Sequence, residues 1–220
     1  NQKLIEEAHN VGRDVILTCD NGIAAVSQIE YAKSLGMTVV VTDHHDVRYE
    51  DTDDGRKYII PQADAVVDPH RADDYSEFKE VCGAFVAFKV VCALEGVSGE
   101  EMCQGYADLA AIGTVADVMK LTGENRLIVK RGIENIDSRA GLTAVLDVAG
   151  LRKRGTTATT VSYGIAPRLN AAGRVGSCLR AVRLLTEEDE SVVTALAKEV
   201  NEANVLRQQL ERDISEQAVE

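Results

Sequence analysis

Two short apolar segments, separated by a spacer of helix length, constrain the fold of this chain more than any other feature. The segments "DVILTCD" (residues 14–20) and "MTVVVTDHHD" (residues 37–46) are apolar until polar residues end them. Between them, residues 22–36 carry apolar side chains at helical spacing and finish on a glycine. Strands that are apolar along their whole length are typical of a parallel sheet covered on both faces. The pattern therefore predicts a strand, a helix and a second strand parallel to the first.

The rest of the chain extends this pattern with one more strand and then with helices. Residues 63–69 predict a short strand, and the acidic, turn-rich segment before it, residues 47–62, predicts a surface excursion. We expect an α/β fold, in which a parallel sheet of Rossmann-like βαβ units flanked by helices precedes a mainly helical part and a C-terminal connector helix. The helices are predicted at 82–96 (buried), 105–121, 124–137, 140–150 and 187–220, whereas the basic, turn-rich stretch 151–177 shows no clear period.

Polar residues follow both of the first two predicted strands. Asp20 ends the first strand, and Asp43, His44 and His45 end the second, so this place holds two of the four histidines in the chain. The carboxyl ends of parallel strands open on the same edge of a sheet, so we expect these side chains to meet. Carboxylates and imidazoles without a thiolate are typical ligands of a hard or borderline divalent cation.

A purely structural explanation of the same residues stays open at this point. In that case Asp43 caps the next helix and the histidines bind carbonyl groups of the loop. Two adjacent histidines after an aspartate, with Asp20 on the same edge, favour the metal site. Asp43 is also placed to hold the second ring nitrogen of a histidine.

The charge distribution and the cysteine content indicate which partners and which cellular compartment to expect. The net charge is −12, yet residues 120–183 contain 12 basic and 4 acidic residues, which concentrates the bases that a phosphate track needs in one segment. The five cysteines are scattered without a C-x-x-C pair, which favours the reducing cytoplasm over a disulfide framework. Cys82, Cys92 and Cys178 have apolar neighbours and are expected to pack. No apolar run approaches the ~20 residues of a membrane span, so no membrane partner is expected.

Four segments resemble motifs of a known superfamily. "TDHHDV" resembles the signature of the DHH phosphoesterases, "LTCDNGI" their second motif, "DLAAIGTVADVMKL" their fourth, and "YGIAPRLNAAGRVGS" a segment of the RecJ branch. RecJ proteins are single-strand-specific 5′→3′ DNA exonucleases of DNA repair and recombination that use Mn²⁺ or Mg²⁺. The resemblance implies a catalytic site in which Asp20, His44, His45 and Asp117 bind metal and Asp43 supports them, with single-stranded DNA as partner. It names no protein partner.

Residues outside the DHH motif complete the predicted site. Asp108 and Asp117 are nine positions apart, on opposite faces of one helix, so only one can face the metal. The motif selects Asp117, and Asp108 is expected at the solvent or at a helix end. Arg168, Asn170 and Arg174 are the candidate phosphate ligands, with His70 as a candidate substrate contact and "LRKRG" (residues 151–155) as a second basic segment. Solvated surface charge is the alternative for both basic segments.

One departure from the superfamily concerns its first motif, a paired-aspartate segment that bridges two metal ions. No segment before Asp20 resembles it. We therefore predict a DHH phosphoesterase domain over 1–185 that lacks its N-terminal strand or strands, and a long connector helix over 186–220 leading to a second domain. The chain is expected to be part of a longer protein, and full activity is not expected of it alone. Enzymes of the superfamily that act on short oligonucleotides or nucleotides, and a non-catalytic DNA-binding module, are the alternatives.

Overall fold

The computed structural model describes residues 1–152 and 155–219, which form two compact units. The first unit consists of residues 1–102 and 119–125, and the second of residues 103–118 and those from 126 onward. The helices α4 (Gly99–Ala116) and α5 (Gly123–Glu134) contribute residues to both. The predicted domain boundary at residue 185 stays a prediction.

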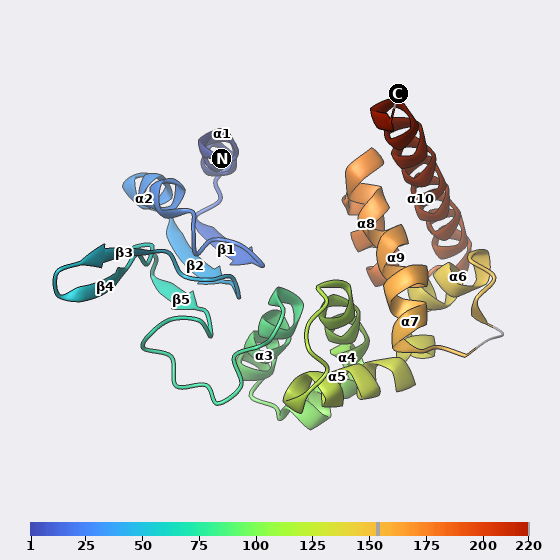
Figure 1. The fold of residues 1–220 in the computed structure, drawn as a ribbon, viewed down its shortest axis with the longest axis horizontal. Coiled ribbons are helices and arrows are strands. Elements are labelled where there is room, and N and C mark those ends of the chain that lie inside the picture. Colours follow the sequence, from blue (N-terminus) through green and yellow to red (C-terminus); the bar gives the residue numbers. More distant parts are fainter. Residues whose placement is uncertain (153–154, 220) are drawn as a thin grey trace. The chain divides into compact units, whose positions relative to one another are not determined.

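A three-stranded parallel sheet forms the centre of the first unit (Figure 1). Its strands are β1 (Val15–Cys19), β2 (Thr38–Thr42) and β5 (Ala65–Val67), in the order β1-β2-β5. Cys19 is paired with Thr42, and Thr42 with Val67, so the three strands finish at one edge. The predicted strands and their parallel pairing are confirmed, and so is the α/β class.

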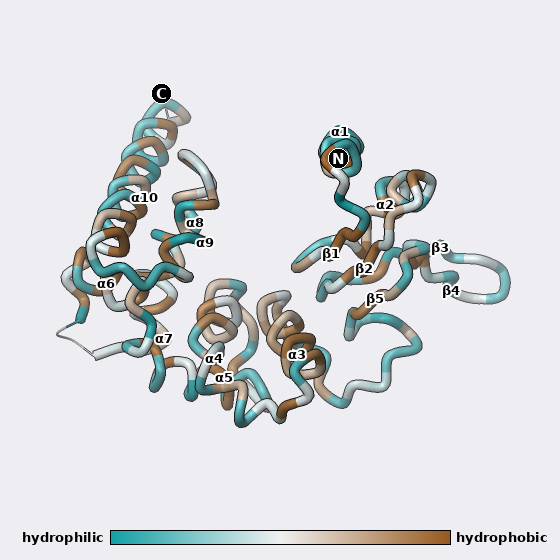
Figure 2. Tube along the Cα trace, turned by 180° about the vertical axis from the view of Figure 1, so that it is seen from behind, coloured by the Kyte–Doolittle hydropathy of each residue, from teal (hydrophilic) through white to brown (hydrophobic). Residues whose placement is uncertain are grey.

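Two helices cover one face of this sheet. α1 (Gln2–Asn10) and α2 (Val26–Ser34) pack on a cluster of buried residues consisting of Ile29, Ala32, Met37, Val39 and Val41. The opposite face of β1 is open in the described chain, since the side chains of Val15 and Leu17 are more than half exposed. Figure 2 shows the hydrophobic colouring of the strands that the sequence pattern predicted.

Two segments of the first unit differ from expectation. The acidic segment before β5 is exposed as predicted, but it forms an antiparallel hairpin of β3 (Tyr49–Thr52) and β4 (Gly55–Tyr58). All residues of both strands are exposed, so the sequence carries no alternating apolar pattern that would predict these strands. The predicted helix at 82–96 is α3 (Gly83–Glu95), but its burial is confined to the first half, because Leu94 is 78% exposed.

The second unit is helical and has its own core. Its core includes Leu142, Leu146, Ile165, Leu184 and Val200. The long helix α10 (Glu190–Val219) packs against α6 (Ala140–Val148), α8 (Ala166–Val175) and α9 (Leu179–Thr186), which confirms the predicted C-terminal helix. Besides α4 and α5, the elements are a 3-10 turn (Ile136–Ser138), α6 (Ala140–Val148), α7 (Ala158–Thr160), a π-helical turn (Val161–Ile165), α8 (Ala166–Val175), α9 (Leu179–Thr186) and α10 (Glu190–Val219).

The interpretation of residues 151–177 as an irregular stretch was wrong. From residue 158 to 175 the chain is continuously helical, through α7, the π-helical turn and α8. Its buried face is built largely from small residues, among them Gly164, Ala166, Ala171 and Ala172, which give little hydrophobic periodicity. Of the segment "LRKRG", residues 153 and 154 lie outside the described residues.

The prediction for Asp108 was also wrong, because this carboxylate is 2% exposed. Arg139 binds it through two hydrogen bonds, from Nε at 2.5 Å and from Nη2 at 3.1 Å. The same guanidinium donates to the carbonyls of Gly105 and Leu185. An arginine 31 positions away neutralises the charge, and this allows Asp108 to be buried.

The cysteines follow the predicted packing in part. Cys82 is buried and Cys92 partly buried, but Cys178 is exposed beside the first turn of α9, so the prediction that Cys178 packs was wrong.

Within the described part of the chain, no helix combines the length and the apolar character needed to cross a membrane.

Candidate metal centre

Asp20 occupies a tight turn directly after β1. Its backbone N–H donates to the carbonyl of Thr42 at 3.1 Å, which keeps the residue in line with the sheet. Its φ angle is +62°, in the left-handed region that residues other than glycine rarely adopt. Gly22 follows at φ +119° and is so close to Thr18 and Val41 that a side chain would not fit. The turn thus presents the Asp20 carboxylate at the carboxyl edge of the sheet.

Asp43 is buried at the end of β2 and organises the loop around it. Its carboxylate accepts hydrogen bonds from the backbone N–H groups of Ile23, His44 and His45, at 2.9, 2.8 and 3.3 Å. The Nδ1 atom of His45 lies 2.6 Å from Oδ1. Burial alone would raise the pKa of Asp43, but the bond from His45 and the three backbone donors outweigh it and lower the pKa. Asp43 is therefore an ionised acceptor.

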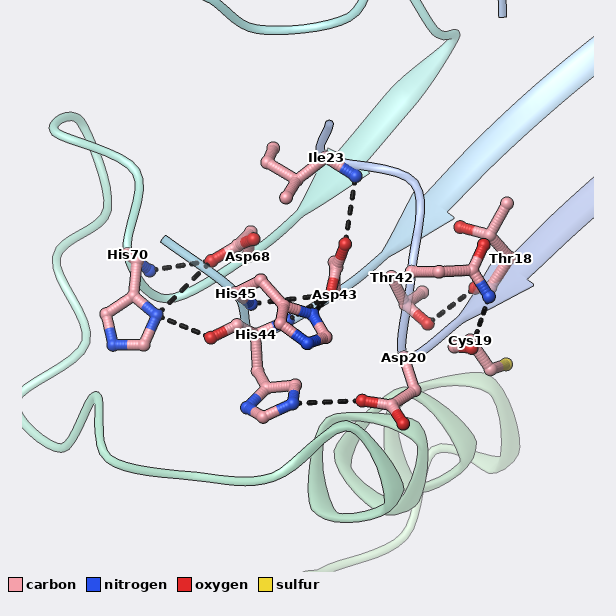
Figure 3. A network of polar contacts seen from close by, with 11 residues as sticks. Thr18, Cys19, Asp20, Ile23, Thr42, Asp43, His44, His45, Asp68 and His70 are labelled. Atoms are coloured by element: carbon pink, nitrogen blue, oxygen red, sulfur yellow. Dashed lines mark hydrogen bonds and ion pairs between the residues drawn. The ribbon is translucent and has the colours of Figure 1, made fainter. Parts of the chain in front are cut away.

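The two adjacent histidines turn their rings to different partners. His44 Nε2 lies 2.9 Å from Asp20 Oδ1, and its side chain is only 10% exposed. Because ionised Asp43 can only accept, His45 Nδ1 carries the proton of this hydrogen bond, and the His45 side chain is 60% exposed. Figure 3 shows both rings, whose centroids are 4.5 Å apart.

His70 supports this loop from the segment after β5. Its Nδ1 atom lies 2.6 Å from the carbonyl oxygen of His44, so that nitrogen must carry a proton and donate it (Figure 3). Its backbone N–H donates to Asp68 Oδ1 at 2.8 Å. Burial raises the pKa of Asp68, and the nearby charge of Asp43 raises it further. The structure thus places His70 beside the predicted site, in contact with the backbone of a candidate ligand.

Three of the predicted ligands converge as a divalent ion would require. One ligand atom each from Asp20, His44 and His45 lies within 4.8 Å of the other two. Typical bonds from a divalent ion to nitrogen or oxygen are about 2.0–2.2 Å, so small side-chain movements bring all three into one coordination sphere. One carboxylate and two imidazoles suit Mn²⁺ better than Mg²⁺, which prefers oxygen. The residues present fit a manganese-type ion.

Asp117, the fourth predicted ligand, belongs to the second unit. It lies just after α4, in an exposed turn in which the following residue, Val118, has a φ of +58°. Its backbone N–H donates to the carbonyl of Gly113 at 2.9 Å, so Asp117 continues the hydrogen bonding of the last turn of α4. Its participation in the cluster of Asp20, His44 and His45 is a proposal.

The predicted phosphate ligands all lie on α8, where they differ in accessibility. Arg168 is half-buried and donates to Gly164 O at 2.7 Å and to Asn201 Oδ1 at 2.9 Å, and burial lowers its pKa. Asn170 and Arg174 are exposed and lie one helical turn apart. Both line a pocket of about 270 Å³ in the second unit.

The sequence analysis singled out only Asn170 and Arg174 among the residues that line this pocket. Ser162, in the π-helical turn, and Arg207, on α10, line it together with Asn170 and Arg174. Arg207 donates to Glu211 at 2.5 Å and to Asn204. Arg207 lies in a helical segment that contains both acidic and basic residues, and no motif distinguishes it from its neighbours. A π-helical turn is often found at functional sites, but single sequences do not reveal one.

Comparison with known proteins identifies the family. Residues 2–114 match the DHH family, N-terminal domain, and this range contains Asp20 and the Asp43-His44-His45 tripeptide. The chain belongs to the DHH family. Within this family it is similar over its whole length to the single-stranded-DNA-specific exonuclease RecJ of Bacillus subtilis, with 36% identity. The chain spans only 27% of that relative.

Solved structures of RecJ resemble the DHH-family chain closely. The Mn²⁺ complex of Thermus thermophilus RecJ aligns with a TM-score of 0.78 and 33% identity, over 97% of this chain and 31% of that one. The Mg²⁺ complex of RecJ from the same organism aligns with a TM-score of 0.63 and 28% identity, over 97% and 35% of the two chains. The RecJ relatives are thus known with both metals that the sequence predicted.

Proposed function

We propose that this DHH-family chain supplies metal-binding and phosphate-binding parts of a RecJ-type exonuclease, which hydrolyses single-stranded DNA in the 5′→3′ direction during repair and recombination. The observation that carries the proposal is the meeting of Asp20, His44 and His45 at the carboxyl edge of the sheet. The similarity to RecJ exonucleases supports the choice of substrate. The chemistry of the donor atoms supports Mn²⁺, with Mg²⁺ as the second choice.

The ligand roles follow from the contacts around each side chain. Asp20, His44 and His45 are proposed to bind the ion directly, with Asp117 of the second unit as a further ligand. Asp43 is proposed to keep the proton on His45 Nδ1, so that Nε2 is always the metal-binding atom. A two-metal site needs more carboxylates than these, and the first motif of the superfamily would supply them.

Bound divalent metal would lower the pKa of the attacking water and stabilise the charge that develops on the phosphoryl group. The residues of this chain are proposed to prepare that chemistry by fixing the donors before substrate arrives. Asp43 and His70 both bind the main chain or ring of a candidate ligand. The Nε2 atom of His70 is proposed to face substrate, because its Nδ1 is engaged with His44.

DNA is proposed to bind the second unit mainly through its phosphates. Arg168, Asn170 and Arg174 are the proposed contacts, and the surrounding residues 120–183 carry a local charge of +8. Tyr163 is exposed on the same helical stretch, but aromatic residues are few in this chain, which has 4% of them. Binding to the backbone without base readout therefore fits this composition better. We place the protein in the reducing cytoplasm, in line with its five scattered cysteines, which include no C-x-x-C motif.

A hydrolysis assay on the intact protein that carries this chain tests the proposal. Single-stranded DNA, dinucleotides and pyrophosphate are offered with Mn²⁺, and Asp20→Ala and His45→Ala are compared with wild type. We expect wild-type protein to degrade single-stranded DNA from the 5′ end and both variants to lose that activity while keeping their fold. Preference for dinucleotides or pyrophosphate would favour a small-substrate phosphoesterase. Binding of DNA without hydrolysis would favour a non-catalytic module.

A further inference from the structure

Gly83, the first residue of α3, lies directly against the side chain of Asp20. It is buried, and a Cβ atom added to it would lie 2.5 Å from the Cβ of Asp20, 2.7 Å from its Cγ, and closer still to its Oδ1. Such distances are far below van der Waals contact. The side chain of Asp20 thus packs directly against the backbone of Gly83, 63 positions later in the chain.

Rotation of the carboxylate would not relieve that clash. The Cβ of Asp20 is fixed by the backbone, and the backbone here is tightly held. The N–H of Asp20 donates a hydrogen bond to the carbonyl of Thr42, and the φ angle of Asp20 is +62°. Gly22, two positions later, packs closely against the side chains of Thr18 and Val41. A side chain at position 83 would therefore force either the turn after β1 or the start of α3 to move.

We propose that Gly83 is a positioning residue for the metal ligand Asp20. The missing side chain lets Asp20 stand beside the start of α3 with its Oδ1 only 2.9 Å from His44 Nε2. The metal-binding part of this inference rests on the proposed function. The contact between Gly83 and Asp20 does not.

The chain contains a matched control for this glycine. Gly99 is the first residue of α4, as Gly83 is of α3. A Cβ atom at Gly99 would meet only the Phe88 ring, at 3.9 Å, an ordinary contact. Neither glycine has a positive φ, so the backbone accepts alanine at both places. Alanine is also a better helix former than glycine. A loss of stability or of metal affinity in Gly83→Ala is therefore attributed to the contact with Asp20.

Titration of the purified chain with Mn²⁺ is the first measurement. Calorimetry compares wild type, Gly83→Ala and Gly99→Ala, and far-ultraviolet circular dichroism monitors the fold. We expect Gly83→Ala to weaken Mn²⁺ binding by about tenfold or more, as is typical when support for a metal ligand is lost, and Gly99→Ala to leave binding unchanged. Equal binding by Gly83→Ala and wild type would overturn the proposal.

A double-variant cycle without metal is the second measurement, and it decides the matter even if wild type binds no Mn²⁺. Asp20→Gly removes the Cβ and carboxylate that Gly83→Ala would strike, and glycine suits the positive φ. We expect Gly83→Ala to lower the melting temperature of wild type and to have no such effect in the Asp20→Gly background. If Gly83→Ala alone fails to fold, the double variant must fold. An equal loss in both backgrounds would show that position 83 acts without Asp20 and would overturn the proposal, whereas absent Mn²⁺ binding by wild type would overturn only the metal site.

Discussion

The Nε2 atom of His44 lies 2.9 Å from Oδ1 of Asp20, although the two residues follow different strands. The parallel pairing of β1 with β2 brings them together, because both strands finish at one edge of the sheet. The two candidate ligands are in contact with each other. A divalent ion would take up a position between groups that the fold has already brought together.

Asp43→Asn is expected to weaken Mn²⁺ binding by about 10- to 100-fold, the usual effect of losing an outer-shell partner. The amide no longer imposes the proton on His45 Nδ1, which Asp43 now accepts at 2.6 Å. Calorimetric titration of the purified chain measures the change. Asp54→Asn, in the exposed hairpin turn, is the control and should bind as wild type does. Equal affinities of Asp43→Asn and wild type for Mn²⁺ would show that Asp43 does not support the proposed metal site.

His70→Ala is expected to weaken Mn²⁺ binding more than His70→Asn. The ring donates from Nδ1 to the carbonyl of His44 at 2.6 Å, and an asparagine amide can also donate there, whereas alanine leaves the carbonyl without this donor. Titration with Mn²⁺ compares the two variants. If both variants bind Mn²⁺ as wild type does but raise the KM of the intact protein for DNA, His70 contacts substrate alone and does not support the metal site.

Asp108→Ala is expected to destabilise the protein by about 3–5 kcal/mol, because it leaves the largely buried guanidinium of Arg139 without its carboxylate. Arg131→Ala, which breaks a surface pair with Glu134, should cost only about 0–1 kcal/mol. Urea denaturation measures both. Because Asp108 pairs with Arg139, Mn²⁺ binding should be unaffected under conditions in which the variant is folded. A specific loss of metal binding would show that Asp108 takes part in the metal site besides pairing with Arg139.

Arg174→Ala is expected to weaken binding of long single-stranded DNA by about tenfold, since a charge-assisted contact is worth roughly 1.5–3 kcal/mol. The effect should shrink as salt is raised. Arg212→Ala, an exposed arginine elsewhere on the second unit, is the matched control. Arg168→Ala is less decisive, because its guanidinium also bonds Gly164 and Asn201 within the protein. A binding isotherm that does not respond to salt would contradict the proposed phosphate track.

The meeting of Asp20, His44 and His45 at one edge of the sheet was predictable, because it depends on local pattern. Strand ends are visible in sequence, and parallel pairing then brings Asp20 and His44 to one edge. The support around them was not predictable. The contact of Gly83 with Asp20 and the pairing of Asp108 with Arg139 join residues far apart in the chain, and neither has a periodic signal. The helical nature of 158–175 was missed because small residues carry its packing.

The most direct test of the metal site is anomalous diffraction at the manganese edge from crystals of this chain grown with Mn²⁺. We expect a peak within bonding distance, about 2.0–2.3 Å, of a carboxylate oxygen of Asp20 and of the Nε2 atoms of His44 and His45. The peak should be absent from crystals of His45→Ala. A saturating Mn²⁺ concentration that leaves this place empty, or that puts the ion on other residues, would contradict the account.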